Sequence, residues 1–226
     1  GVGSMVLQGK SGDDDIDVDL EVPALGVAIT VEGDLPTAGS DTLTVTGVNG
    51  SNDSPDWAPN ASDGGTLTVG GQTITVQTVE HLIYEGETDN ETLTVNGTAG
   101  DDVFVHTPTD RDAGSISIGS ETETLLGIRY EHLGVSGTVT IAGAGQSTAD
   151  TLVALGSDGN DTLNVSATGV VDLRSQFGNH VDVFSSSIET LTLESLDGDD
   201  TFNVTGAVTY PYATTNLFGG NPSASD

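Results

Sequence analysis

One short segment recurs along the chain, and it restricts the fold more than any other feature of the sequence. Residues 150–164 read DTLVALGSDGNDTLN: an alternating strand, a Gly/Asp turn and a second short strand. Segments 189–203 and 91–105 repeat this arrangement, and weaker copies begin near residues 3 and 41. Repeated units of this kind predict a stacked architecture, because one unit alone cannot bury its apolar face.

The alternation within each copy predicts β-strands. Apolar residues at every second position give each strand one apolar face and one face of Thr, Ser, Asn and Asp. No segment shows sustained helical periodicity. Strands this short do not form stable isolated hairpins. Stacking equivalent strands about 4.8 Å apart would pair their backbones and bury one continuous apolar column.

We therefore predict an all-β protein, and specifically a right-handed parallel β-helix (β-solenoid) with repeats of roughly 40 residues. The turns at Gly70-Gly71 and Gly119-Ser120 keep a second architecture open. In that alternative, adjacent strands pair as hairpins and form small antiparallel β-sandwiches in tandem.

The repeat frame also predicts how the chain is divided. The expected parts are one solenoid domain over 1–209, repeat starts near 3, 41, 91, 150 and 189, loop insertions over 50–65 and 106–114, and a C-terminal tail or linker over 210–226. The first insertion has no periodicity and contains Pro55 and Pro59, which favours a loop. Trp57 within it either anchors the loop to the core or exposes its ring to a sugar. Because the chain begins inside a repeat, we expect a segment of a longer polypeptide.

The charge of the chain limits its partners. Among 226 residues, 35 are acidic and only Lys10, Arg111, Arg129 and Arg174 are basic, for a net charge of -31. Phosphate binding needs Lys and Arg, so we predict no nucleic-acid partner, and anionic membrane surfaces are disfavoured for the same reason. Cations and a salt-rich medium are the partners that such a charge favours.

Composition indicates an extracellular or cell-surface protein. Thr, Ser, Gly and Asp are abundant and Lys is nearly absent, which is typical of secreted proteins built of short strands. The chain has no cysteine, so disulfides, thiolate metal sites and cysteine nucleophiles are excluded. No apolar run approaches the roughly 20 residues that a membrane helix needs, so we predict no membrane insertion.

The acidic turns resemble a known metal-binding repeat. Residues 156–164 (GSDGNDTLN) resemble the hemolysin-type calcium-binding repeat (RTX), G-G-x-G-x-D-x-(apolar)-x, and so do 97–105, 9–17 and 195–203. In that family, backbone carbonyls and the sixth-position aspartate bind calcium. The resemblance implies calcium here, with candidate ligands Asp14, Asp102, Asp161 and Asp200 at the sixth position and Asp13, Asp101, Asp158 and Asp199 in the same turns.

Electrostatics gives an independent reason to expect a cation. Two carboxylates about 5 Å apart repel by about 1 kcal/mol in water, and several-fold more where they are partly buried. A divalent ion reverses that sign, and calcium prefers six to eight hard oxygen ligands. The alternative is plain turn chemistry, because Asp-Gly and Asn-Gly form turns readily and exposed Asp keeps strand edges soluble. Both interpretations stay open.

Over most of its length the chain looks like the repeat regions of very large secreted or surface-attached bacterial proteins, including adhesins. That resemblance implies a non-enzymatic structural or adhesin-type segment, rigidified by calcium and in contact with neighbouring repeats or surface glycans. The alternative is a carbohydrate-binding or polysaccharide-cleaving β-helix, which would need clustered aromatic residues on one concave face.

The histidines offer little evidence of catalysis. Glu80-His81 and Glu131-His132 look like paired acid–base motifs, and we interpret them as one repeat position seen twice. The two residues of each pair would lie on opposite faces of a strand, which is poor geometry for cooperation. Paired carboxylates for glycoside cleavage remain open with 35 acids available, although the acids follow the repeat and do not cluster at one place. Arg174 near His180 is the best remaining candidate. We therefore predict no enzymatic activity.

Overall fold

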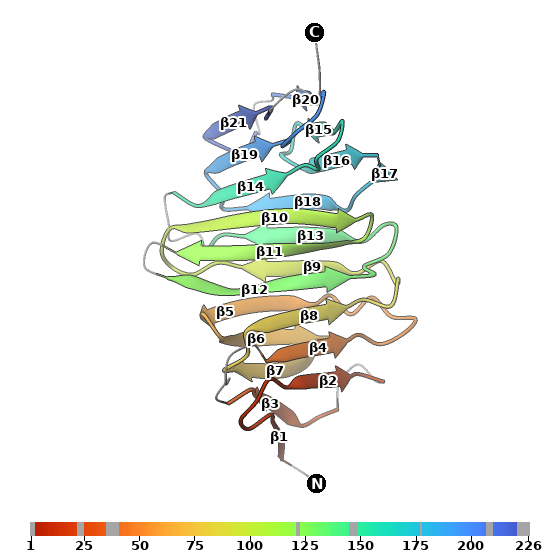
Figure 1. Cartoon of the computed structure of the whole chain (residues 1–226), viewed down its shortest axis with the longest axis vertical. Coiled ribbons are helices and arrows are strands. Elements are labelled where there is room, and N and C mark those ends of the chain that lie inside the picture. The colour runs from red at the N-terminus through yellow and green to blue at the C-terminus, as the bar shows by residue number, and fades with distance from the viewer. Residues whose placement is uncertain are drawn as a thin grey trace.

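The protein is described by a computed structural model that covers residues 3–21, 25–34, 41–120, 123–144, 149–176, 178–206 and 210–220. These residues form strands and no helix, so none of them forms a helix long and apolar enough to cross a membrane. The strands lie one above another along the long axis, with the two chain ends at opposite ends of the stack (Figure 1). The all-β prediction is confirmed.

The strands form two sheets, which we call sheet I and sheet II. Sheet I contains, in spatial order, β1 (Ser4–Gln8), β3 (Ala28–Glu32), β7 (Gln72–Gln77), β6 (Gly64–Val69), β5 (Asp56–Ala61), β9 (Thr92–Asn96), β13 (Thr138–Ala142), β18 (Asp182–Ser186), β16 (Val171–Ser175), β15 (Thr162–Val165) and β20 (Thr201–Val204), with β17 (Gly178–Asn179) beside β16. Sheet II contains β2 (Asp15–Asp19), β4 (Thr42–Thr46), β8 (His81–Glu85), β12 (Thr124–Glu131), β11 (Ala113–Ser120), β10 (Asp102–Asp110), β14 (Thr151–Leu155), β19 (Thr190–Glu194) and β21 (Thr214–Phe218).

Most pairs of neighbouring strands are parallel and in register. In sheet I, β13 lies between β9 and β18, and Val139 stands opposite Leu93 and Val183. All three side chains are buried, whereas the threonines on either side of Leu93 and of Val139 are half-buried. The described strands do not form tandem antiparallel sandwiches, because strands from both halves of the chain join the same two sheets.

The five sequence copies are strand–turn–strand units that pass from one sheet to the other. The copies that begin near residues 3 and 91 run from sheet I to sheet II, as β1–β2 and β9–β10. Those that begin near 41, 150 and 189 run from sheet II to sheet I. The same local sequence therefore serves both directions of passage, and the copies do not lie in one column.

Both predicted loop insertions contain strand residues. Residues 50–65 include β5 and the start of β6, and residues 106–114 include the end of β10 and the start of β11. Their prolines did not prevent pairing, because Pro59 and Pro108 lie where the antiparallel register shifts. A bulge of this kind tolerates a residue that cannot donate a backbone hydrogen bond.

These segments belong to antiparallel meanders that extend the sheets. In sheet I, β5 pairs with β9 and β7 pairs with β3, with β6 between them. In sheet II, β10 pairs with β14 and β12 pairs with β8, with β11 between them. Both meanders fold back toward the N-terminal end of the stack. The two meanders face one another across the core. A hydrogen bond of 3.0 Å shows this, in which the indole Nε1 of Trp57 on β5 donates to the carbonyl of Leu126 on β12.

Trp57 is a core residue. It is 0 % exposed and packs among the apolar residues that fill the space between the sheets. The interpretation of Trp57 as an anchor is therefore confirmed, and the interpretation as an exposed sugar-stacking ring is wrong.

The predicted C-terminal tail contains one further strand. Residues 214–218 form β21, which pairs in parallel with β19 in sheet II. This part of 210–226 is therefore neither a tail nor a linker, and residues 221–226 lie outside the described residues.

Candidate functional site

We use the term corner for a connection in which the chain passes from one sheet to the other. Most corners contain an acidic residue near their C-terminal end. A glycine ends the strand before the corner and the acid stands at the start of the next strand. The pairs are Gly9 with Asp14, Gly33 with Asp41, Gly47 with Asp53, Gly86 with Glu91, Gly97 with Asp102, Gly143 with Asp150 and Gly156 with Asp161. A Cβ on any of these glycines would come closer than 3.0 Å to its acidic side chain. Glycine is therefore required because the acid packs directly against its backbone.

Replacing Gly97 by alanine tests this packing. The new Cβ would lie 2.7 Å from Oδ2 of Asp102 and 2.9 Å from the ring of Phe104, so we expect a loss of about 1–3 kcal/mol in the free energy of unfolding. Gly119→Ala is the matched control, because its Cβ would meet no atom within 4 Å. Urea unfolding of both variants measures the difference, and equal stabilities would contradict the packing argument.

The corner acids form ladders through the backbone. Within each ladder, the N–H of one acid donates to the carboxylate of the acid in the next layer. The bonds run from Asp14 to Asp41 (2.8 Å), Asp41 to Glu80 (2.8 Å), Asp102 to Asp150 (2.9 Å), Asp150 to Glu189 (2.9 Å), Asp53 to Glu91 (2.8 Å) and Asp161 to Asp200 (2.9 Å). We call these the carboxylate ladders. They supply acceptors to backbone donors at the corners, where a strand partner is lacking.

The corners are of two kinds. In closed corners, the residue after the glycine donates its N–H to the acid. These donors are Val48 to Asp53, Thr98 to Asp102 (2.6 Å) and Ser157 to Asp161 (2.5 Å). In open corners, the residue at this position has a left-handed φ, as at Lys10 (76°), Asp34 (80°) and Glu87 (54°). Leu196 (63°) has the same conformation at the corner before Asp200, where Ser195 replaces the glycine.

Open corners leave a carboxylate oxygen without a donor. Their acids, Asp14, Asp41, Glu91 and Asp200, each have one buried oxygen with no hydrogen-bond partner. Asp53 and Asp150 have one such oxygen as well. Buried polar atoms normally have partners, so each of these oxygens can accept a proton, a water or a cation.

Burial raises the pKa of several ladder acids. It raises the pKa of Glu91 to about 7; the hydrogen bond from Asp53 opposes this change and the negative charge of Asp53 adds to it. Burial likewise raises the pKa of Asp102 and Asp161, against the hydrogen bonds from Thr98 and Ser157. Negative charge at the corners is therefore destabilising in the absence of a counter-ion.

The predicted metal ligands occupy these corners, but they are not gathered at one point. Asp161 and Asp200 are neighbours in one ladder. Asp14 and Asp102 belong to two other ladders, on corners that run from sheet I to sheet II. Of the other four candidates, Asp13, Asp158 and Asp199 are exposed and Asp101 is half-buried.

The ligands predicted from the sequence did not include six ladder acids, namely Asp41, Asp53, Glu80, Glu91, Asp150 and Glu189. Asp41, Glu91, Asp150 and Glu189 each precede a Thr-Leu pair that opens a strand, and this recurring acid was the signal available in the sequence. Asp41, Glu91 and Asp150 are 0 % exposed, so they are more deeply buried than half-exposed Asp14 and Asp200.

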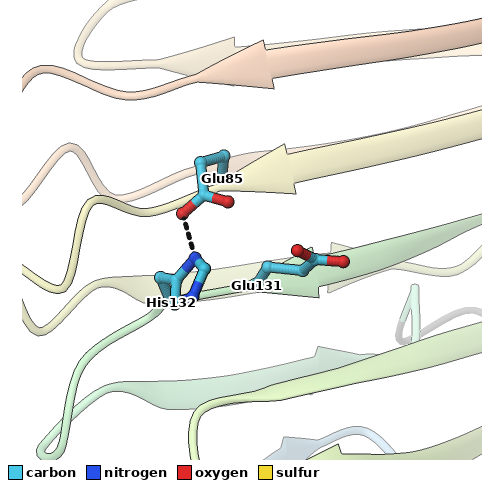
Figure 2. A group of neighbouring side chains, drawn as sticks. All are labelled: Glu85, Glu131 and His132. Carbon is cyan, nitrogen blue, oxygen red and sulfur yellow. Dashed lines mark hydrogen bonds and ion pairs between the residues drawn. The ribbon is translucent and has the colours of Figure 1, made fainter.

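A different cluster lies on sheet II. Figure 2 shows Glu85 at the end of β8 facing His132, which follows β12, with Glu131 beside it. The His132 Nδ1 lies 2.6 Å from Oε1 of Glu85, and this contact raises the pKa of His132. One ligand atom from each of the three residues lies within 4.8 Å of the other two. Arg129 forms an ion pair with Glu131.

The register corrects the interpretation of the Glu-His pairs. Tyr84 and Glu85 stand opposite Tyr130 and Glu131, so Glu80-His81 begins its strand whereas Glu131-His132 ends one. The two pairs are not one repeat position. His132 has a left-handed φ of 51°.

His106 and His180 make hydrogen-bond contacts within the fold. Burial lowers the pKa of His106 to about 4, and its Nε2 lies 2.7 Å from the Tyr130 hydroxyl. His180 lies 2.7 Å from the Ser175 hydroxyl and 2.7 Å from the Asp110 carbonyl. A serine–histidine contact is one part of a nucleophilic site, but the group orienting His180 is a carbonyl, which lacks the charge that stabilises an imidazolium.

Comparison of the chain with protein-family models, with curated proteins and with solved structures found no match.

Proposed function

We propose that this chain is a non-enzymatic structural segment of a large extracellular or cell-surface bacterial protein, built as a right-handed parallel β-helix. The alternation of the chain between two mostly parallel sheets supports this architecture. Such a stack can lengthen layer by layer, because each layer contacts only its neighbours. Adhesion would be the role of the larger protein, with the segment holding its binding parts at a distance.

Calcium at the open corners is the second part of the proposal. It is supported by one observation, the unpartnered carboxylate oxygens of the ladders. Asp14 and Asp41 are successive ladder members with such oxygens, and both stand at open corners. The carbonyl of Gly33 lies within 3.0 Å of the point where a Gly9 Cβ would stand, as does Asp14 Oδ2. Carboxylate and carbonyl oxygens are the ligands that calcium prefers.

Thermal unfolding with and without calcium tests this proposal. At a calcium concentration one hundred times the Kd, binding adds about 2.7 kcal/mol. For a chain of this size we expect Tm to rise by about 5–10 °C in millimolar calcium and the rise to vanish in EDTA.

Two asparagine variants make the test specific. Asp41→Asn removes charge at an open corner and should abolish most of the calcium-dependent rise. Asp102→Asn, at a closed corner where Thr98 donates to the carboxylate, is the matched control and should retain it. A Tm that is the same in calcium and in EDTA for the unaltered chain would eliminate calcium and leave plain turn chemistry.

A further inference from the structure

The parallel pairing of β8 with β12 brings two carboxylates together on the outer face of sheet II. Tyr84 and Tyr130 stand opposite one another and are both 0 % exposed, so their rings point into the core. Side chains alternate along a strand, and the next residues, Glu85 and Glu131, therefore project outward. They also stand opposite one another, one layer apart.

His132 adds an imidazole to the two carboxylates. Its Nδ1 contacts Glu85 across the two layers, and Figure 2 shows the three side chains on the same side of the ribbon. Glu85 and His132 also line a cavity of about 530 Å³, together with Asn49, Glu87 and Thr88. The cluster is thus open to solvent on one side, where an ion with bound water could enter.

We propose that Glu85, Glu131 and His132 form a binding site for a divalent transition-metal ion of the zinc class. One imidazole nitrogen and two carboxylate oxygens are ligands that zinc accepts at about 2.0–2.2 Å, and a water molecule would complete a tetrahedral set. The ligand atoms lie within 4.8 Å of one another, so small side-chain rotations would bring them to these distances. Calcium prefers oxygen ligands alone, so the imidazole favours zinc over calcium at this point.

The neighbouring charged groups have opposing effects on the affinity of this site for a metal ion. Arg129 contacts Glu131 and competes with a metal for its carboxylate. Glu87 lies in the same cavity and its carboxylate accepts a hydrogen bond from Asn49 at 2.9 Å, so it adds negative charge nearby. The net charge of -31 raises the local concentration of cations. A proton on His132 competes with the metal, so binding should weaken as the pH falls.

Isothermal titration of the whole chain with zinc tests the proposal. We expect one site per chain whose affinity falls at least about tenfold in His132→Ala and in Glu85→Gln. His81→Ala is the matched control, because His81 is an exposed histidine at the other end of β8 and should leave the affinity unchanged. Circular dichroism of each variant shows that the sheets are intact.

Two further measurements decide the outcome. Paramagnetic cobalt added to the isotopically labelled chain should broaden the NMR amide signals of residues 85, 131 and 132 at lower cobalt concentrations than other signals. Millimolar calcium should not displace the cobalt, so these signals should stay broadened. Equal zinc affinity in His132→Ala and the unaltered chain would overturn the proposal, as would broadening that begins at the corner acids. This inference is independent of calcium at the corners, since that proposal is judged by Asp41→Asn and this one by His132→Ala.

Discussion

Replacing Trp57 by alanine is expected to lower the free energy of unfolding by about 3–5 kcal/mol, the largest effect of any single substitution proposed for this chain. Trp57 is fully buried on β5, and its indole N–H donates to the Leu126 carbonyl on β12 in the opposite sheet. Its removal would leave a cavity between the two meanders and an unpaired buried carbonyl.

Chemical denaturation of two further variants separates these contributions. Trp57→Phe keeps an aromatic ring but loses the indole donor, so its effect should be smaller than that of Trp57→Ala. Val135→Ala is the surface control, since Val135 is 78 % exposed. If Trp57→Ala were no less stable than Val135→Ala, the packing of the two meanders across the core would be wrong.

The metal-free protein is expected to lose up to about 3 kcal/mol of stability as the pH rises from 4.5 to about 7. Burial raises the pKa of Glu91 from 4.5 in the unfolded chain to about 7 in the folded one. Between these values the folded state binds the proton more tightly. The contribution of Glu91 is therefore fully present below pH 4.5 and is lost as the pH rises through 7.

Glu91→Gln assigns this pH dependence to one residue. Glutamine keeps an acceptor for the Asp53 N–H but carries no charge, so most of the slope between pH 5 and 7 should disappear. Glu189→Gln changes the equivalent acceptor of another ladder, where the Asp150 N–H donates, and should retain the slope. Urea unfolding in EDTA across this range measures both variants. An unchanged slope in Glu91→Gln would show that other carboxylates govern the pH dependence.

The alternation of apolar and polar residues predicted strands correctly, whereas the prolines predicted a loop where the structure has a strand. The alternating segments that follow Asp41, Glu91, Asp150 and Glu189 are strands β4, β9, β14 and β19. Prolines in 50–65 predicted a loop, yet β5 forms there because its partners β6 and β9 supply the pairing and a bulge accommodates Pro59. Which strand pairs with a segment depends on tertiary contacts that local sequence does not encode.

The acidic corners were likewise predicted from the sequence only in part. A turn with an aspartate at its end was visible in residues 97–105 and 156–164, and its acids Asp102 and Asp161 do stand at corners. Which acids are neighbours was not visible, because it depends on the direction in which each copy passes between the two sheets. The copies that begin near 150 and 189 run in the same direction and bring equivalent acids together, whereas those that begin near 91 and 150 run in opposite directions. Asp161 therefore meets Asp200, while Asp102 meets Asp150.

Side-chain period and turn chemistry act over a few residues, so the amino-acid sequence alone was enough to establish an all-β chain of short strands joined by acidic glycine turns. The order of the layers could be established only from the folded structure, because it arises from hydrogen bonds between strands that are distant in the sequence. The same holds for the contact of Glu85 with His132, two residues that are separated by 47 positions and that the pairing of β8 with β12 brings together.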